Sequence, residues 1–103
     1  STSQAFGMLY FLYFAPHHRR GGVDLLVDPL YQKNGLATEA LNLLVRYAFS
    51  YLKLHQLFVH IPVANEPSKS LFTRCGFTVT GILTDWITTK DGYSDVLIMQ
   101  RIN

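Results

Sequence analysis

Six consecutive residues, Gln32-Lys33-Asn34-Gly35-Leu36-Ala37, carry the clearest chemical signal in the chain. They follow a short apolar run, Val23 to Val27, and precede an amphipathic stretch that begins at Thr38. A glycine lets the backbone approach a ligand closely, and the first turn of a following helix presents unpaired N–H groups and the positive end of the helix dipole. The arrangement predicts a turn that binds phosphate, with an empty turn as the alternative. The sequence lacks Gly-Lys-Ser/Thr and Gly-x-Gly-x-x-Gly, which disfavours a P-loop and a dinucleotide fold.

Other side chains with ligating or reactive groups form no recognisable set. His17 and His18 stand next to two arginines, where they are either solvated or act as bases or contacts to an acidic substrate. His55 and His60 lie near or within a predicted strand and are interpreted as structural. Cys75 is the only cysteine, so it is interpreted as a buried structural thiol rather than a nucleophile. No metal site is predicted, because no His, Asp, Glu and Cys have the spacing of one.

The composition predicts one small globular domain, residues 1–103. Hydrophobic residues make up 49% of the 103 residues and charged residues 16%, which favours a packed core over disorder. The net charge is only +2 and the basic residues are scattered, so nucleic acid is not an expected partner. The apolar run Phe6 to Ala15 is too short to span a bilayer and lacks a basic leader, so we expect no membrane association and a cytoplasmic location.

The elements that position the turn can be read from apolar spacing. Phe6 to Phe14 and Val23 to Val27 are predicted to form an antiparallel hairpin around the polar connection from Pro16 to Gly22. A helix is predicted from Ala37 to Lys53. Its apolar positions are Ala37, Ala40, Leu41, Leu44, Val45, Ala48 and Leu52.

A third strand, Leu57 to Val63, follows that helix and is predicted to run parallel to the Val23 strand. Proline donates no hydrogen bond to a sheet, so the two strands are expected to part at Pro62 and leave a wedge above the turn. Asn65 is predicted to cap a second short helix, which ends at Gly76. The remaining strands are predicted at Phe77–Ile82, Asp85–Thr89 and Tyr93–Arg101.

With these elements in place, the chain from about Phe6 to Ile102 resembles the acetyl-CoA-dependent GNAT acyltransferases. The turn Gln32 to Ala37 is similar to the pyrophosphate arm of that superfamily, Gln/Arg-x-x-Gly-x-Gly/Ala, and the segment Asn65 to Phe77 is similar to its second CoA-binding helix. Asp28 to Gln32 and Gly81 to Asp95 are most similar to the spermidine and ribosomal-protein N-acetyltransferase branch. The resemblance implies an α/β (α+β) fold, a mixed and mostly antiparallel sheet with a central helix after the turn and a second short helix.

The resemblance also implies acetyl-CoA as co-substrate and a primary amine as acceptor, either a polyamine or a protein N-terminus. Backbone N–H groups from Gln32 to Thr38 would hold the CoA pyrophosphate. The pantetheine would lie in the wedge beside two strand residues, with Asn65 as a hydrogen-bonding partner or simply a helix cap, and with Lys69 near the CoA phosphates or solvated. The implied cofactor-binding residues are Leu26, Val27, Gln32, Lys33, Asn34, Gly35, Leu36, Ala37, Thr38, Asn65, Ser68, Lys69 and Phe72.

The chain departs from the family pattern at positions that carry proton transfer. Phe72 stands where many relatives hold a tyrosine that protonates the leaving thiolate, and phenylalanine cannot donate that proton. Gly21 or Gly22 stands where relatives often hold a glutamate. Asp24 is two residues on and therefore on the same strand face as Gly22, which makes it the candidate catalytic base, with an ordinary solvated aspartate as the alternative.

The resemblance further implies a strand and two helices that nothing before Phe6 supplies, so the chain is either a fragment or a shortened member. The Phe6 strand is then expected to present an unpaired edge, which favours association into a homodimer. An N-acetyltransferase domain is the leading hypothesis. A catalytically silent CoA-binding module is one rival, and an interaction domain with an empty turn is the other.

Overall fold

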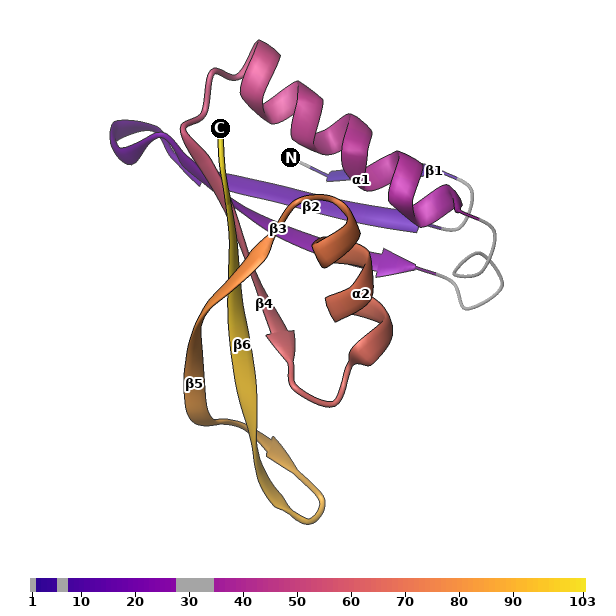
Figure 1. The fold of residues 1–103 in the computed structure, drawn as a ribbon, viewed down its shortest axis with the longest axis vertical. Helices are drawn as coiled ribbons and strands as arrows, with labels where there is room; N and C mark the ends of the chain where they lie inside the picture. Colours follow the sequence, from indigo (N-terminus) through magenta and orange to yellow (C-terminus); the bar gives the residue numbers. More distant parts are fainter. Residues whose placement is uncertain (1, 6–7, 28–34) are drawn as a thin grey trace.

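A hairpin of β2 (Met8–Ala15) and β3 (Arg20–Val27) forms one half of the sheet (Figure 1). The computed structural model describes residues 2–5, 8–27 and 35–103. The two strands pair antiparallel from Met8↔Val27 to Ala15↔Arg20, around a short 3-10 turn, which confirms the predicted hairpin. One boundary was wrong, because Gly21 and Gly22 belong to β3 and not to the connection. They lie where the backbone of β4 runs alongside β3, a place where a strand commonly holds glycine.

The outer edge of β2 is partly covered. A short strand, β1 (Thr2–Ala5), pairs antiparallel with β2 from Thr2↔Phe11 to Ala5↔Met8. The prediction that the Phe6 strand presents an unpaired edge is therefore wrong for this half of β2. The residues of β1 are polar or small and show no apolar alternation, so the sequence does not predict this strand. The segment pairs as a strand because the edge of β2 offers N–H and C=O groups to it.

The predicted first helix is present in two parts. An α-helix, α1 (Leu36–Arg46), continues into a π-helical segment, η3 (Tyr47–Tyr51), in which the Leu52 N–H bonds the Tyr47 carbonyl at 3.1 Å. Lys53, at φ 59°, turns the chain into the next strand. The 3.6-residue spacing of apolar positions predicted the helical course, but it does not distinguish α from π hydrogen bonding in the last turn.

The other half of the sheet is built around β6 (Gly92–Ile102), which lies between β4 (Gln56–Pro62) and β5 (Thr78–Thr89). The strand order is β1-β2-β3-β4-β6-β5, and only the β3–β4 pair is parallel. The sequence predicts two strands in the region of β5, whereas the structure has one. Bulges between Val79 and Gly81 and between Leu83 and Ile87 interrupt the apolar alternation without ending the strand.

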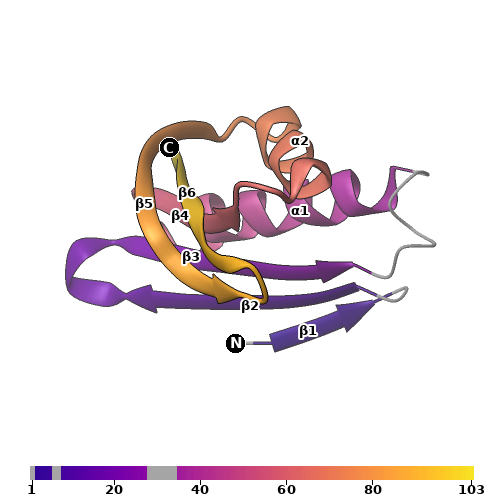
Figure 2. The same ribbon diagram turned by 90° about the horizontal axis from the view of Figure 1, so that it is seen from below.

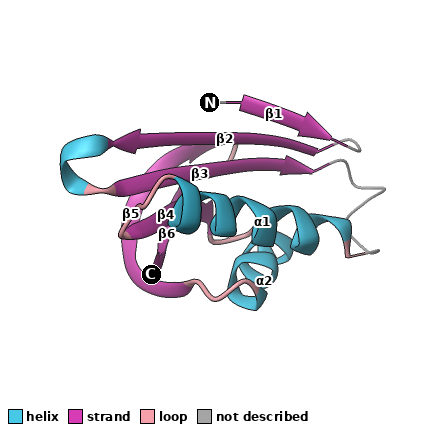
Figure 3. Cartoon of the chain, turned by 90° about the horizontal axis from the view of Figure 1, so that it is seen from above, coloured by secondary structure: helices cyan, strands magenta, loops and turns pink. Residues whose placement is uncertain are grey.

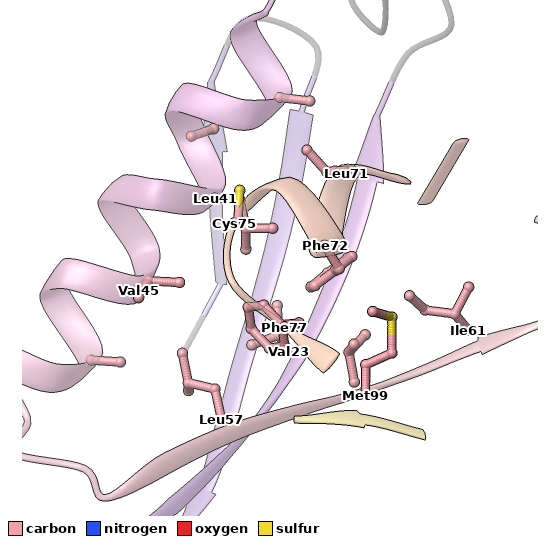
Figure 4. Close-up of a cluster of buried hydrophobic side chains, with 14 of the residues drawn as sticks. Val23, Leu41, Val45, Leu57, Ile61, Leu71, Phe72, Cys75, Phe77 and Met99 are labelled. Atoms are coloured by element: carbon pink, nitrogen blue, oxygen red, sulfur yellow. The ribbon is translucent and has the colours of Figure 1, made fainter. Parts of the chain in front are cut away.

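Both helices cover one face of the sheet (Figures 2 and 3). The second helix, α2 (Glu66–Arg74), packs with α1 over a buried cluster shown in Figure 4. Leu41 of α1, Leu57 of β4 and Phe77 after α2 are almost entirely excluded from solvent. Burial of such side chains contributes about 1.5–3 kcal/mol each, and this packing fixes α1 and α2 relative to the β3–β4 junction. The mixed, mostly antiparallel sheet with a central helix and a second short helix agrees with the predicted fold class.

Candidate functional site

The central feature of the site is the point at which β3 and β4 separate. The two strands pair in parallel only at Arg20↔Gln56, Gly21↔Leu57 and Gly22↔Phe58. Beyond these positions β3 stays paired with β2 as far as Val27, while β4 stays paired with β6 as far as Pro62. The edges at residues 23–27 and 59–62 therefore face each other without a β-ladder between them (Figure 1).

The predicted wedge is present, but its predicted starting point at Pro62 was wrong. The strands part after Phe58, and Pro62 keeps its place in the ladder with β6, opposite Val96. A proline removes only its own N–H, whereas the course of β4 is set by continuous pairing with β6 from Gln56 to Pro62. The opening is consequently longer than the sequence predicted.

The helix that follows the phosphate turn begins at the glycine singled out in the sequence. Gly35 has φ 78° and ψ −4°, a left-handed conformation that glycine adopts without steric cost. Its carbonyl accepts the Glu39 N–H at 3.1 Å and starts α1, whose first N–H groups lack partners within the helix. Leu36 and Thr38 are half-buried and Ala37 is buried. Gln32, Lys33 and Asn34 lie outside the described residues, and only the backbone is described for Leu26 and Val27.

The first turn of α2 lies after the end of β4 and carries three predicted CoA contacts. The Asn65 side-chain oxygen accepts the Ser68 N–H at 3.2 Å, which confirms the helix-cap reading of Asn65. Ser68 and Lys69 are half-buried. Lys69 also lines a shallow hollow of ≈ 290 Å³ on the outer side of α2, together with Glu66, Ser70, Thr73 and Arg74. A role of these residues in holding CoA stays a prediction.

The last turn of α2 brings a cation to the start of α1. Arg74 Nη2 lies 3.5 Å from Thr38 Oγ1, and Cys75 Sγ lies 3.8 Å from the Thr38 carbonyl oxygen. A guanidinium next to a helix N-terminus adds to the attraction that the helix dipole exerts on an anion. Sequence reasoning missed Arg74, because a single arginine at the end of a helix has no distinguishing pattern.

Cys75 agrees with the prediction of a buried thiol. Its residue is 2% exposed, and burial raises the pKa of the thiol, an effect partly offset by the nearby charges of Arg74 and Arg101. The Arg101 guanidinium also donates a hydrogen bond to the Cys75 carbonyl. A thiol held neutral in the core is a poor nucleophile.

Phe72 is buried in the hydrophobic core. Its ring is 2% exposed and meets Phe77 edge-on, with centroids 5.0 Å apart and planes at 87°. Figure 4 shows it turned into the cluster that includes Ile61 and Met99. This packing gives the ring a structural role, and its place in the wall of the CoA site stays a prediction.

Asp24 lies on the opposite face from the helices. Val23 is buried under α1, so the alternation of β3 turns Asp24 to the open face, where it is exposed. It is two residues beyond the last β3–β4 pair, Gly22↔Phe58. His60, which the sequence suggested was structural, is exposed on β4. It alternates with the buried residues Val59 and Ile61 and thus shares the open face with Asp24.

The described residues contain no group of three His, Cys, Asp or Glu side chains that could hold a metal ion. In the same part of the chain, no helix is long and apolar enough to cross a membrane. Among the described residues, the site offers backbone amides, the Arg74 guanidinium and the Asp24 carboxylate.

A helix that begins at a left-handed glycine, a parallel strand pair that separates, and a second helix against the first turn together form an acetyltransferase-type fold. Residues 1–78 match the family described as an Acetyltransferase (GNAT) domain, and the chain belongs to this family. The resemblance drawn from the sequence is confirmed.

Individual relatives agree with this assignment. The chain is 36% identical over 82 residues to the spermidine N(1)-acetyltransferase of Escherichia coli (strain K12), a match that covers 80% of this chain and 44% of the relative. A solved structure of the spermidine N-acetyltransferase from Vibrio cholerae, in complex with CoA and spermine, has a TM-score of 0.85 at 28% identity and covers 92% of this chain and 57% of that one. A dodecameric structure from the same organism has a TM-score of 0.84 at 28% identity, covering 92% and 56%. The chain spans about half the length of the curated relatives it matches.

Proposed function

We propose that residues 1–103 form a single domain of an N-acetyltransferase that transfers the acetyl group of acetyl-CoA to a primary amine. The observation that carries the proposal is the separation of β3 from β4 after Gly22↔Phe58, with α1 and α2 on one side of the opening. An extended pantetheine chain fits between strand edges whose N–H and C=O groups lack ladder partners, because it can hydrogen-bond to both edges.

The phosphate end of acetyl-CoA is assigned to the start of α1. Backbone N–H groups from Gln32 to Thr38 would surround the pyrophosphate, and the Arg74 guanidinium near Thr38 would add a positive charge. Asn65 and Ser68 would contact the pantetheine from α2. Leu26 and Val27, on the stretch of β3 that is not paired with β4, would line the opposite edge.

The acceptor amine is assigned to the open face of the sheet, where Asp24 lies. A neutral amine attacks the thioester carbonyl carbon, the carbonyl oxygen gains negative charge near the Val27 N–H, and the carbon–sulfur bond then breaks. The proton released by the amine passes to the Asp24 carboxylate, directly or through water. Phe72 has no proton to give, so the leaving thiolate takes its proton from water, and protonated Asp24 returns its proton to the hydroxide that this leaves.

A polyamine is the acceptor that the relatives support most. The Escherichia coli relative is named a spermidine N(1)-acetyltransferase, and the Vibrio cholerae structure holds CoA together with spermine. A protein N-terminus remains the second acceptor in the proposal. We also propose assembly of identical chains in the cytoplasm, and the dodecameric relative supports self-association.

The proposal is tested by measuring thiol release from acetyl-CoA with spermidine, with spermine and with a peptide that has a free N-terminus. We expect release with at least one of these amines, at a rate that Asp24→Asn lowers by about 10²-fold or more, the usual contribution of a general base. Asp91→Asn, a change of the same kind in the turn between β5 and β6, is the matched control and should keep the full rate. Equal rates in the two variants would remove Asp24 from the mechanism.

A second function is favoured by the buried ring of Phe72 at the position of the missing acid. In this alternative the chain binds CoA without catalysing transfer. CoA would then raise the melting temperature while thiol release stays at the background rate with every amine. If CoA leaves the melting temperature unchanged and no amine gives thiol release above the background rate, both functions are excluded.

A further inference from the structure

A second, basic hollow lies at the far end of the sheet from the start of α1. It has a volume of ≈ 440 Å³ and forms where the β2–β3 connection, the segment before β4 and the last residue come together. Its lining residues are His17, His18, Arg19, Lys53, Leu54, His55 and Asn103. We call this site the basic hollow. Its volume is within the range of sites that bind small molecules.

Main-chain hydrogen bonds hold the basic hollow together. The Arg19 carbonyl accepts the N–H of His55 at 2.7 Å and that of Gln56 at 3.3 Å. The N–H of Asn103 donates to the His55 carbonyl at 2.8 Å, and its side-chain amide donates to the Leu54 carbonyl at 3.4 Å. Three segments that are distant in sequence are thus fixed by their backbones, which leaves the charged side chains available.

Two of the lining residues hold an unfavourable backbone conformation. Arg19 has φ 51° and Lys53 has φ 59°, and they are two of the three non-glycine residues with positive φ among those described. A positive φ is sterically unfavourable for a residue with a Cβ. The Arg19 carbonyl accepts two main-chain N–H groups in this conformation, and Lys53 lines the same hollow.

The basic side chains around the basic hollow have no Asp or Glu partner among the described residues. In the described part of the chain, the side chains of His17, His18, Arg19, Lys53 and His55 make no hydrogen bond or ion pair, and all five residues are exposed. No Asp or Glu is among the described lining residues. The Arg19 guanidinium and the Lys53 ammonium group outnumber the one terminal carboxylate of Asn103, the last residue of the sequence, and their local positive potential attracts a multiply charged anion.

We propose that the basic hollow binds a small ligand carrying more than one phosphate group. The site is distinct from the CoA turn, because it lies beside the Arg20 end of β3 whereas the turn follows the Val27 end. An eight-residue strand separates these ends by about 23 Å. The proposal is independent of acetyl transfer. It requires only the basic side chains that line the hollow and the main-chain hydrogen bonds that hold its three segments together.

The test is a ¹H–¹⁵N NMR titration of the whole chain with inorganic phosphate and then with tripolyphosphate. We expect saturable shifts of the amide signals of residues 17–19 and 53–55, with tripolyphosphate binding about tenfold or more tightly than phosphate, because each additional charged contact adds affinity. Arg19→Asn and Lys53→Asn each remove a charge and keep a residue that tolerates positive φ. Each should weaken tripolyphosphate binding about three- to tenfold, while Arg46→Gln, an exposed cation on α1, should leave it unchanged.

The source of the phosphate is distinguished by vesicles of phosphatidylcholine with and without phosphatidic acid. If the chain sediments with the acidic vesicles and Lys53→Asn reduces the sedimented fraction, the ligand is a lipid headgroup. If the chain binds only soluble tripolyphosphate, the ligand is a free phosphate compound. The proposal is overturned if shifts appear only at residues 36–39, if they do not saturate by about 10 mM ligand, or if both asparagine variants bind as tightly as the parent chain. None of these outcomes depends on whether the chain transfers acetyl groups.

Discussion

The two roles of Asn65, helix cap and CoA contact, can be separated by two substitutions at one position. The side-chain oxygen accepts the Ser68 N–H at 3.2 Å, while the side-chain NH₂ group makes no hydrogen bond to another described residue. Asn65→Asp keeps an acceptor at the cap and removes the NH₂ donors. Asn65→Ala removes both.

The expected magnitudes follow from the geometry of the cap. Loss of an N-cap acceptor costs about 0.5–2 kcal/mol, and the long, exposed bond to Ser68 places Asn65→Ala in the lower part of that range, near 1 kcal/mol. Asn65→Asp should stay within about 0.5 kcal/mol of the parent, because a carboxylate at a helix N-terminus is favourable. If the NH₂ group donates to the pantetheine, both variants lose about 1 kcal/mol of CoA binding, or roughly fivefold in Kd.

The assay combines urea denaturation with calorimetric titration of CoA. Asn42→Asp, the same chemical change at an exposed position on α1, controls for the added negative charge. Unchanged CoA affinity in both Asn65 variants would show that Asn65 is only a cap. Weaker binding in Asn65→Ala alone would show that the cap, and not the NH₂ donor, supports CoA, and either result would refute the assigned contact.

Three further predictions concern stability, pH and the phosphate turn. Gly76→Ala should destabilise the fold by about 2–3 kcal/mol, because a Cβ at φ 89° would lie 2.7 Å from Arg101 Nη1. Gly35→Ala, at φ 78° with nothing within 4 Å of the added Cβ, should cost only about 1–2 kcal/mol. Equal losses of stability for the two variants in urea denaturation would contradict the role of Arg101. Burial raises the pKa of the Cys75 thiol, so the unfolded chain loses this proton at a lower pH than the folded chain. The free energy of unfolding should therefore fall above about pH 9. Cys75→Ala should lack that fall when urea denaturation at about pH 7.5 is compared with that at about pH 9.5. Arg74→Gln should weaken CoA binding about three- to tenfold without affecting tripolyphosphate binding at the basic hollow, as measured by calorimetry; an unchanged Kd for CoA would separate Arg74 from the phosphate site.

Much of the site was readable from local sequence. Gly35 predicted a turn before α1, Asn65 predicted the cap of α2, and Gly76 predicted its end, because each of these depends on the conformation or hydrogen bonding of a few adjacent residues. The predicted separation of the strands at Pro62 was wrong because the point of separation does not depend on local sequence. Where two strands part is decided by their other partners, β2 and β6, which lie far away in the sequence.

By itself, the sequence determined most of the elements from β2 to β6, their order and the family, since these follow from apolar periodicity, turn residues and two local motifs, but it gave no signal for β1 and divided β5 in two. Only the tertiary structure decided that the opening begins after Phe58, that Arg74 meets Thr38, and that basic residues from the β2–β3 connection and from the segment before β4 surround one hollow. The physical reason is that local conformational preference acts over a few residues, whereas strand pairing and side-chain convergence join positions that are tens of residues apart.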